Sequence, residues 1–463
     1  MASRSGAARC VVLFPFPYQG HLNPMLRLAA ALHARGLAVA VIHTAHHAPN
    51  PADHPADYRF VPLPADVPPE LLASEDVARL LTVLDATFVP PFMDRLAALL
   101  AEEDAGSGVC CVIADVQWYS APAAARELGV PALGLMTSSA ASFRTYMAYP
   151  TLIDKGYLPV QEAHMDDLVH ELPPFRVKDL QRIDRSSLAE FADLLERIVA
   201  GARRCSGLIL NTFDAIEAED VAKIREDMAI PVFAVGPLNK LSPSVRSSLL
   251  PQDRGCLDWL DSQEPDSVVY VSFGSFVAID ADEFMELAWG LARSKRPFVW
   301  VVRPRLVRGF ESGELPKELE KEIRDRGRIV EWAPQEEVLA HPAVCAFVTH
   351  NGWNSTVEGV SAGVPMACRP LAGDQLGTAR YVCNVWKVGV EVEVGAQLEW
   401  GRIQVAIEKL MDGNGGKEVR ERMKCLKKMA DKVVSEGGSS HTAFVNLVDF
   451  ILSLPCSKQE MQI

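Results

Sequence analysis

The sequence predicts an α/β protein built from two Rossmann-like, doubly wound domains. Short β-rich runs alternate with longer segments of helical periodicity, and this alternation starts again in the second half of the chain. The strand candidates are apolar almost throughout, which is typical of a parallel sheet covered by helices on both faces. With 463 residues, the chain is long enough to form two cores of ordinary domain size.

The first half supplies the elements of one sheet. The expected strands are Cys10–Phe16, Leu37–Thr44, Tyr58–Leu63, Val109–Asp115 and Pro131–Thr137. The expected helices are Asn23–Arg35, Ser74–Phe88, Pro91–Glu102 and Tyr119–Leu128. Gly36 ends the first helix, and Pro90 with Pro91 is expected to separate the second helix from the third.

The second half repeats the pattern. Its expected strands are Ser267–Gly274, Pro297–Arg303, Arg328–Trp332, Val344–Thr349, Pro365–Arg369 and Val388–Val394. Its expected helices are Asp280–Arg293, Leu315–Asp325, Asn354–Ala362, Gln375–Val385 and Trp400–Met411, with long helices over 417–453. We expect a first domain over 1–236, a linker over 237–253 and a second domain over 254–445. A C-terminal helix over 446–463 is expected to pack back on the first domain.

Composition excludes several classes of protein. The 46 Lys and Arg residues face 60 Asp and Glu residues, which gives a formal charge of −14 and no general reason to bind nucleic acid or an anionic membrane. The ten cysteines form no C-x-x-C pair, so they are interpreted as small core residues in a reducing compartment. No apolar run reaches the roughly 18 residues of a membrane span, and Pro15 and Pro17 break the short N-terminal apolar stretch. A cytoplasmic monomer is expected.

Several common catalytic motifs are absent from the sequence. It contains no G-x-G-x-x-G, no Walker A loop and no H-E-x-x-H, so dinucleotide, P-loop and zincin functions lose their main sequence support. Asp280 and Asp282 could hold a metal on a nucleotide diphosphate, but they stand where a helix begins, and a capping role is favoured. His43, His46, His47 and His54 lack the spacing of metal ligands and are expected at the surface or at a pocket rim.

His21 and Asp115 are the candidate catalytic pair. His21 follows the first strand, and Asp115 ends another, so both are expected at the sheet edge where doubly wound domains bind ligands. A carboxylate there can orient the imidazole and stabilise its cation. Because no Ser or Cys nucleophile accompanies the pair, His21 is interpreted as a base that acts on a bound hydroxyl.

The segment from Trp332 to Gln375 carries the richest set of binding groups. Trp332 offers a flat face on which a base can stack, and Gln335 and Glu358 can bond ribose hydroxyls. The helix expected to begin at Asn354 offers backbone N–H groups and a positive dipole to a diphosphate. Asp374 and Gln375 offer the donors and acceptors that sugar hydroxyls require.

This 44-residue segment resembles the signature box of the plant UDP-dependent glycosyltransferases. The resemblance extends to Gly20-His21, Asp115, Asp258-Trp259-Leu260 and Ser272-Phe273-Gly274-Ser275, and so covers essentially the whole chain. It looks closest to the branch with the grass benzoxazinoid and steviol-glycoside glucosyltransferases, as Phe14–His21 and Leu135–Ser139 suggest. It implies a GT-B fold, with two domains facing a central cleft, and an inverting transfer of glucose from UDP-glucose to a small, largely apolar, hydroxylated plant metabolite such as a benzoxazinoid, terpenoid or phenolic. UDP-glucose is a co-substrate, and no metal or other cofactor is expected.

The resemblance also implies a role for each site residue. Trp332 and Ala333 would hold uracil, and Gln335 and Glu358 would hold ribose. The diphosphate would be held by Ser275, His350, Asn354 and Ser355, and the sugar by Trp353, Asp374, Gln375 and Thr137. His21 would be the base and Asp115 its partner. An apolar acceptor pocket is expected from Phe16, Trp118, Tyr119, Phe143 and Met147.

Two positions depart from the family pattern. Asn351 stands where Cys is more usual, a change expected to be neutral, and Thr378 stands where Asn is common, which bears on the donor preference. Two alternatives remain open: a UDP-sugar-binding protein without transferase activity, and a metal-dependent sugar-nucleotide enzyme that uses Asp280 and Asp282.

Overall fold

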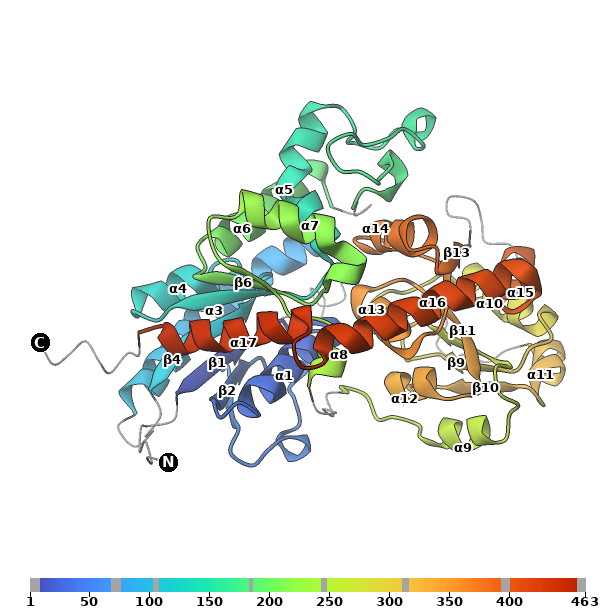
Figure 1. Ribbon diagram of the computed structural model, residues 1–463, viewed down its shortest axis with the longest axis horizontal. Helices are drawn as coiled ribbons and strands as arrows, with labels where there is room; N and C mark the ends of the chain where they lie inside the picture. The colour runs from blue at the N-terminus through green and yellow to red at the C-terminus, as the bar shows by residue number, and fades with distance from the viewer. Residues whose placement is uncertain are drawn as a thin grey trace, which may run out of the picture. The chain divides into compact units, whose positions relative to one another are not determined.

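The computed structural model describes residues 9–67, 76–102, 108–182, 186–242, 248–309, 316–392 and 400–455. The chain forms two compact units (Figure 1). Unit 1 comprises residues 1–165, 182–249 and 432–463, and unit 2 comprises residues 166–181 and 250–431.

Unit 1 is built on a seven-stranded sheet of order β3-β2-β1-β4-β5-β6-β7, in which every pairing is parallel. Its strands are β1 Cys10–Phe14, β2 Ala38–His43, β3 Arg59–Pro62, β4 Val109–Asp115, β5 Ala132–Met136, β6 Gly207–Leu210 and β7 Val232–Ala234. Its helices are α1 Gln19–His33, α3 Val77–Ala101, α4 Ala121–Glu127, α5 Ala140–Asp154, α6 Leu188–Arg203, α7 Asp214–Asp227, α8 Leu238–Leu241 and α17 Ser439–Ser453.

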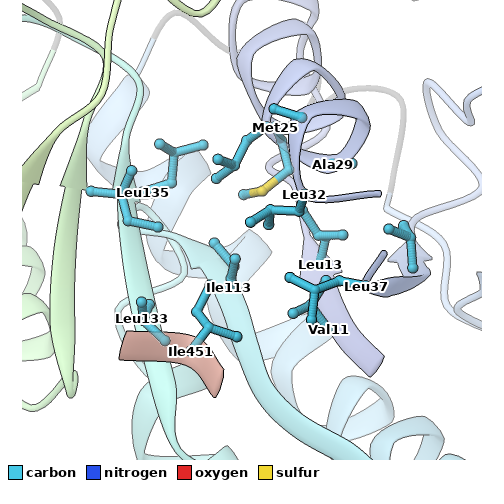
Figure 2. Packing of buried hydrophobic residues seen from close by; sticks show 14 of the residues in the cluster. Val11, Leu13, Met25, Ala29, Leu32, Leu37, Ile113, Leu133, Leu135 and Ile451 are labelled. Carbon is cyan, nitrogen blue, oxygen red and sulfur yellow. The ribbon is translucent and has the colours of Figure 1, made fainter. Parts of the chain in front are cut away.

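Both faces of this sheet are buried, as the apolar strands predict. In β1, Val11 and Leu13 belong to a core cluster on one face, and Cys10, Val12 and Phe14 belong to a cluster on the other. Figure 2 shows the first face, where Met25, Ala29 and Leu32 of α1 and Ile451 of α17 lie over strands β1, β4 and β5. Alternate side chains of each strand therefore enter different cores, which is why the strand sequences show no polar alternation.

Unit 2 is built on a six-stranded parallel sheet of order β10-β9-β8-β11-β12-β13. Its strands are β8 Val268–Ser272, β9 Phe298–Val301, β10 Gly327–Val330, β11 Val344–Thr349, β12 Met366–Cys368 and β13 Gly389–Glu391. Its helices are α9 Gly255–Asp261, α10 Ala281–Arg293, α11 Lys317–Ile323, α12 Gln335–Ala340, α13 Trp353–Ala362, α14 Gln375–Arg380, α15 Trp400–Met411 and α16 Gly413–Val434, with a π-helical turn over Tyr381–Val385. Two parallel Rossmann-like sheets confirm the predicted fold class.

The helix break expected at Pro90 and Pro91 is wrong. Both prolines lie inside α3, which runs unbroken from Val77 to Ala101. The two missing N–H groups cost hydrogen bonds, but the helix buries Phe88 and Phe92, and Phe92 stacks on Phe14 with 4.3 Å between ring centroids. Tertiary packing thus overrides the local helix-breaking signal.

The first helix also begins earlier than predicted. It starts at Gln19 after an extended Tyr18, so His21 lies in its first turn and Pro24 lies inside it. The strands β6 and β7 and the helices α5, α6 and α7 are absent from the prediction. The two strands are short, whereas Ser139 and Ser187 cap the starts of α5 and α6 and are signals that the prediction missed. The parts of the predicted elements over residues 74–75, 315 and 393–394 lie outside the described residues.

One segment from the first half of the chain belongs to unit 2. Residues 166–181 join that unit, and within them the Asp179 carboxylate pairs with Arg380 at the end of α14, with an N–O distance of 2.6 Å. Phe175 packs edge-on against Tyr381, with 5.7 Å between centroids. The linear domain boundaries predicted from the sequence stay a prediction, and the compact units follow a discontinuous division.

Candidate active site

His21 and Asp115 come together at the carboxyl edge of the unit 1 sheet. The Nδ1 atom of His21 lies 2.7 Å from an Asp115 Oδ atom, and the Asp115 side chain is fully buried. The other Asp115 oxygen accepts a hydrogen bond from the backbone N–H of Gln117 at 3.0 Å. A buried carboxylate against Nδ1 favours the tautomer with the proton on Nδ1, which places the ring's lone pair on Nε2.

Topology brings this pair together from distant parts of the sequence. Strand β1 pairs with β4, and β4 pairs with β5, so residues that follow these three strands meet at one edge. His21 lies in the first turn of α1 after β1, and Asp115 ends β4. The His21 side chain is 27% exposed, which leaves the imidazole accessible while its partner is shielded from water.

Thr137 directly follows β5 and completes the cluster. Its Oγ1 atom lies 2.9 Å from His21 Nδ1 and 3.4 Å from an Asp115 carboxylate oxygen. The sequence prediction assigned Thr137 to the sugar, and that assignment stays a prediction. The structure adds a contact between Thr137 and the His21–Asp115 pair. No sequence signal indicated this contact, because it depends on the order of the strands in the sheet.

A buried acid anchors the loop that carries Thr137. The Glu217 carboxylate accepts hydrogen bonds from the backbone N–H groups of Ala140 and Ala141, at 3.0 and 2.9 Å, where α5 begins. Glu217 has non-helical backbone angles inside α7. Burial, with a smaller contribution from Asp220, raises its pKa to about 7. The segment between β5 and α5 is therefore held at one end by the strand pairing of β5 and at the other end by Glu217.

The predicted acceptor residues separate into two groups. Phe16, Trp118 and Phe143 are almost fully buried, and the Trp118 Nε1 atom donates to the Pro15 carbonyl at 3.1 Å. Tyr119 and Met147 are partly exposed. Phe16 also lies beside the His21 ring, with 5.4 Å between centroids. Trp118 and Phe143 present no free surface in this arrangement, so their assignment to the pocket gains no support here.

In unit 2, the residues predicted to bind ribose form one hydrogen-bonded cluster. The Gln335 amide donates to Glu358 at 2.7 Å and to the Ser355 hydroxyl at 3.1 Å. Its Oε1 atom accepts from the Tyr270 hydroxyl at 3.1 Å. Tyr270 is a member that the sequence analysis missed, because a tyrosine within an apolar strand resembles ordinary core. The cluster fixes the orientation of polar groups that a ribose would meet.

His350 is held between two glycines at the end of β11. A Cβ atom on Gly274 would lie 2.6 Å from the His350 ring, and one on Gly352 would lie 2.5 Å from Nε2. Both positions therefore exclude any other residue. Burial lowers the pKa of His350 to about 4, and the nearby charge of Arg303 acts in the same direction. The ring is neutral at pH 7 and offers hydrogen bonds rather than charge.

The other predicted donor-site residues lie at the start of α13 or in loops that follow strands β8 and β10 of the same sheet. Trp353 opens this helix and is buried, Asn354 and Trp332 are partly exposed, and Ser275 is exposed in the loop after β8. Ala333 is buried. The first N–H groups of α13 have no partner within the helix, so this end suits an anion.

Gln375 and Asp374 lie where α14 begins. The Gln375 Oε1 atom accepts hydrogen bonds from the N–H groups of Leu371 and Ala372, at 2.9 and 3.2 Å. Its oxygen thus fixes the preceding loop, and its Nε2 group is the part suited to a ligand. Thr378 bonds the Asp374 carbonyl at 3.0 Å, and Asn351 adopts a positive φ of 62° and bonds Cys368.

The acidic and histidine clusters weighed in the sequence do not form metal sites within the described residues. No group of three potential His, Cys, Asp or Glu ligands occurs in that part of the chain. Asp280 occupies the N-cap position of α10 as predicted, but its side chain makes no capping hydrogen bond and instead pairs with Arg308 at 2.9 Å. His43 is buried rather than at the surface, and its Nδ1 atom contacts the Thr44 carbonyl at 2.9 Å.

Comparisons with known proteins agree on one family. Residues 250–432 match the family model "UDP-glucoronosyl and UDP-glucosyl transferase", and residues 8–51 match "Glycosyltransferase, N-terminal domain". The chain is 60% and 59% identical to two Zea mays proteins, DIMBOA UDP-glucosyltransferase BX8 and BX9; the alignments cover 96% and 97% of this chain and 99% and 98% of theirs.

Solved structures resemble this chain over nearly its full length. A UDP-glucosyltransferase from Polygonum tinctorium capable of glucosylating indoxyl aligns with a TM-score of 0.81 at 28% identity, covering 96% of this chain and 99% of that one. Os79 from O. sativa, in complex with UDP, aligns with a TM-score of 0.79 at 28% identity, covering 95% and 100%. The fold and site define a nucleotide-sugar-dependent transferase, and the chain belongs to the plant UDP-glycosyltransferase family. Within it, the chain is a UDP-glucosyltransferase of small plant metabolites.

Proposed function

We propose that this enzyme transfers glucose from UDP-glucose to a hydroxyl group of a benzoxazinoid such as DIMBOA and yields a β-glucoside. The His21–Asp115 pair, with 2.7 Å between Nδ1 and the carboxylate, is the observation that carries the transferase reaction. The benzoxazinoid acceptor is supported by the two Zea mays relatives, whose names both specify DIMBOA.

In the proposed reaction, Nε2 of His21 takes the proton of the acceptor hydroxyl. The hydroxyl oxygen attacks the anomeric carbon of the α-linked donor, the bond from that carbon to the diphosphate oxygen breaks, and UDP leaves with the electron pair. A single displacement inverts the anomeric configuration. Asp115 stabilises the imidazolium that forms, and its buried position gives that interaction strength.

The donor is assigned to unit 2. Trp332 and Ala333 would hold uracil, and Gln335 and Glu358 would hold ribose. The start of α13 and the neutral His350 would donate hydrogen bonds to the diphosphate, which gains negative charge as the bond to the sugar breaks. Gln375 would offer its Nε2 group to a sugar hydroxyl, because its oxygen already holds the preceding loop.

A direct assay tests this proposal. The purified protein is incubated with UDP-glucose and DIMBOA, alongside terpenoid and phenolic acceptors, and products are detected by mass spectrometry. We expect a DIMBOA monoglucoside to form faster than any other product, and His21→Ala to slow its formation by about 100-fold or more. Efficient glucosylation of a phenolic or terpenoid acceptor without DIMBOA activity would overturn the acceptor. UDP binding with no transfer to any acceptor would favour a binding protein.

We also propose that the enzyme works in the cytoplasm. The nine cysteines among the described residues are all free thiols, and seven of them are buried, as expected in a reducing compartment. No helix in the described part of the chain is long and apolar enough to cross a membrane. Fractionation of plant cells, with activity followed in the cytosolic and organelle fractions, tests this location.

A further inference from the structure

Arg303 is a buried cation without an acidic partner among the described residues. It follows strand β9 and is 7% exposed. Its guanidinium donates to the carbonyls of Gly274 at 2.8 Å and Pro304 at 3.2 Å, and to that of Val277. Burial lowers its pKa to about 10, so the group stays charged at neutral pH. A buried charge that is not neutralised is costly and calls for an explanation.

A second arginine that follows a strand at this edge differs from Arg303 because it has an acidic partner. Arg369 follows β12, and its guanidinium pairs with Glu283 at 2.8 Å. Its charge is therefore largely neutralised within the fold. Within the described ranges, Arg303 makes hydrogen bonds only to neutral carbonyl oxygens, which hold the guanidinium in place and leave its positive charge available to a further group.

The position of Arg303 indicates which kind of ligand group its charge could neutralise. Strands β9, β8 and β11 are neighbours in the sheet, so Arg303, Gly274 and His350 lie at the same edge. Gly274 accepts the Arg303 bond and packs directly against the His350 ring. The charge of Arg303 reaches His350, whose pKa it helps to lower. Helix α13 begins three residues after His350.

The charge of a bound diphosphate can be compared with the positive charge that His350, helix α13 and Arg303 supply at this edge. A nucleoside diphosphate carries at least two negative charges, and hydrogen bonds from neutral groups leave that charge unbalanced. His350 is neutral at pH 7 because its pKa is about 4, and the dipole of α13 supplies only a partial positive charge. Arg303 supplies a full one.

We propose that Arg303 is a positioning and charge-balancing residue for the diphosphate of the nucleotide sugar. Its hydrogen bonds to Gly274 and Val277 fix the loop that carries Ser275, and its charge offsets that of the bound diphosphate. The assignment rests on the proposed donor site in unit 2.

Calorimetric titration of the full chain with uridine, UMP and UDP tests this role. Uridine reaches the base and ribose groups but has no phosphate, so it serves as an internal reference. In Arg303→Gln we expect UDP affinity to fall by about tenfold or more, UMP affinity to fall less, and uridine affinity to change less than about twofold. Arg303→Lys keeps the charge but not the fork of donors, and should retain a UDP-to-uridine ratio within about threefold of wild type.

The control is Arg308→Gln, which removes an exposed arginine paired with Asp280 and should leave all three affinities unchanged. Equal losses for uridine and UDP in Arg303→Gln would show a general structural role and overturn the proposal, as would wild-type affinity for UDP. If Arg303→Gln does not fold, Arg303→Lys decides, because a tenfold fall in its ratio contradicts the charge role. A wild-type protein that binds uridine and UDP equally would overturn the donor site itself.

Discussion

His21 and Asp115 form a His–Asp pair, and the chain contains another of similar length. His33 Nε2 lies 2.8 Å from Asp57, close to the 2.7 Å between His21 Nδ1 and Asp115. The pairs differ in the ring nitrogen that faces the carboxylate and in burial, because the Asp57 side chain is 68% exposed while that of Asp115 is fully buried. Water screens the surface pair, so only the buried carboxylate can strongly stabilise a protonated imidazole.

Replacing these residues should therefore have unequal effects. We expect His21→Ala to lower kcat by about 100-fold or more, and Asp115→Ala to lower it less, because Asp115 acts through the imidazole. UDP affinity should stay unchanged in both, since the residues proposed to hold uridine and the diphosphate belong to unit 2. Steady-state kinetics and UDP titration give both numbers, and His33→Ala serves as the matched control. Turnover like that of wild type in His21→Ala would contradict the mechanism.

Substitutions of Gln375 and Trp332 should distinguish contacts with the sugar of the donor from contacts with its uridine. A pocket that bonds a specific hydroxyl disfavours the wrong epimer by about 1–3 kcal/mol for each group left unpaired, so UDP-glucose should exceed UDP-galactose by at least about tenfold in kcat/KM. Gln375→His should reduce this ratio, because it removes the Nε2 donor and the acceptor for Leu371 and Ala372. Trp332→Ala should weaken both donors equally.

A further variant distinguishes the two functions of the Gln375 side chain. Gln375→Glu keeps an oxygen for the two loop N–H groups and removes the donor, so it should also reduce the ratio if Nε2 contacts the sugar. A changed UDP-glucose to UDP-galactose ratio of kcat/KM in Trp332→Ala, with no change in either Gln375 variant, would contradict the assignment of Trp332 to uridine and of Gln375 to the sugar.

At the scale of elements, the N-terminus of α13 explains how a diphosphate could be held without a divalent ion. The backbone N–H groups of its first turn and its dipole, together with hydrogen bonds from neutral side chains, can stabilise an anion. Asp280, one of the two acidic candidates for a metal ligand, is already paired with Arg308. We therefore expect activity to persist in EDTA. Loss of activity on chelation, restored by Mg²⁺ or Mn²⁺ in the same assay, would favour the metal-dependent alternative.

Helix α5 depends on a carboxyl group that titrates near neutrality. The pKa of Glu217 is raised from 4.5 to about 7 in the folded protein, so the native state holds this proton more tightly than the unfolded chain does. The associated stabilisation is fully present below about pH 4.5 and is lost as the pH rises through 7. Stability should therefore decline across this interval.

Glu217→Gln removes this pH dependence. The melting temperature of the variant, relative to wild type, should rise as the pH increases from 5 to 8, whatever constant cost the amide adds at the N–H groups of Ala140 and Ala141. Glu219→Gln is the matched control, since Glu219 is exposed on the same helix. A difference that stays constant over this pH range would contradict the raised pKa.

At the scale of the whole molecule, the C-terminal helix is part of the unit that the N-terminus begins. Phe444, Leu447, Val448 and Ile451 of α17 belong to the same core cluster as Val11 and Leu13 of β1, and Arg9 donates to the Leu454 carbonyl at 2.9 Å. The first strand of unit 1 is therefore packed against α17, the last helix among the described residues.

Two neighbouring residues of α17 test this contribution. Ile451→Ala should lower the free energy of unfolding by about 2–5 kcal/mol, because it leaves a cavity in a closed core. Leu452→Ala, one position along and 42% exposed, should change it by less than about 0.5 kcal/mol. Denaturant unfolding gives both values. Equal effects would show that α17 does not contribute to the core.

The sequence by itself determined the repeating strand–helix order, most strand positions, the sheet edge that bears the site and the segment from Trp332 to Gln375. Those features depend on local periodicity, on the residue that follows each strand and on a contiguous motif, all of which can be read along the chain. The unbroken helix through Pro90 was the clearest failure, because burial against the sheet outweighed local propensity.

Tertiary structure decided which residues meet. His21 and Asp115 are 94 residues apart, and their contact with Thr137 depends on the adjacency of β1, β4 and β5. The anchoring of α5 by Glu217, the entry of residues 166–181 into unit 2 and the burial of Arg303 against neutral carbonyl groups likewise arise from packing between distant segments. The physical reason is that burial, and with it the charge state and hydrogen bonding of a side chain, depends on what surrounds it in space rather than on its neighbours in sequence.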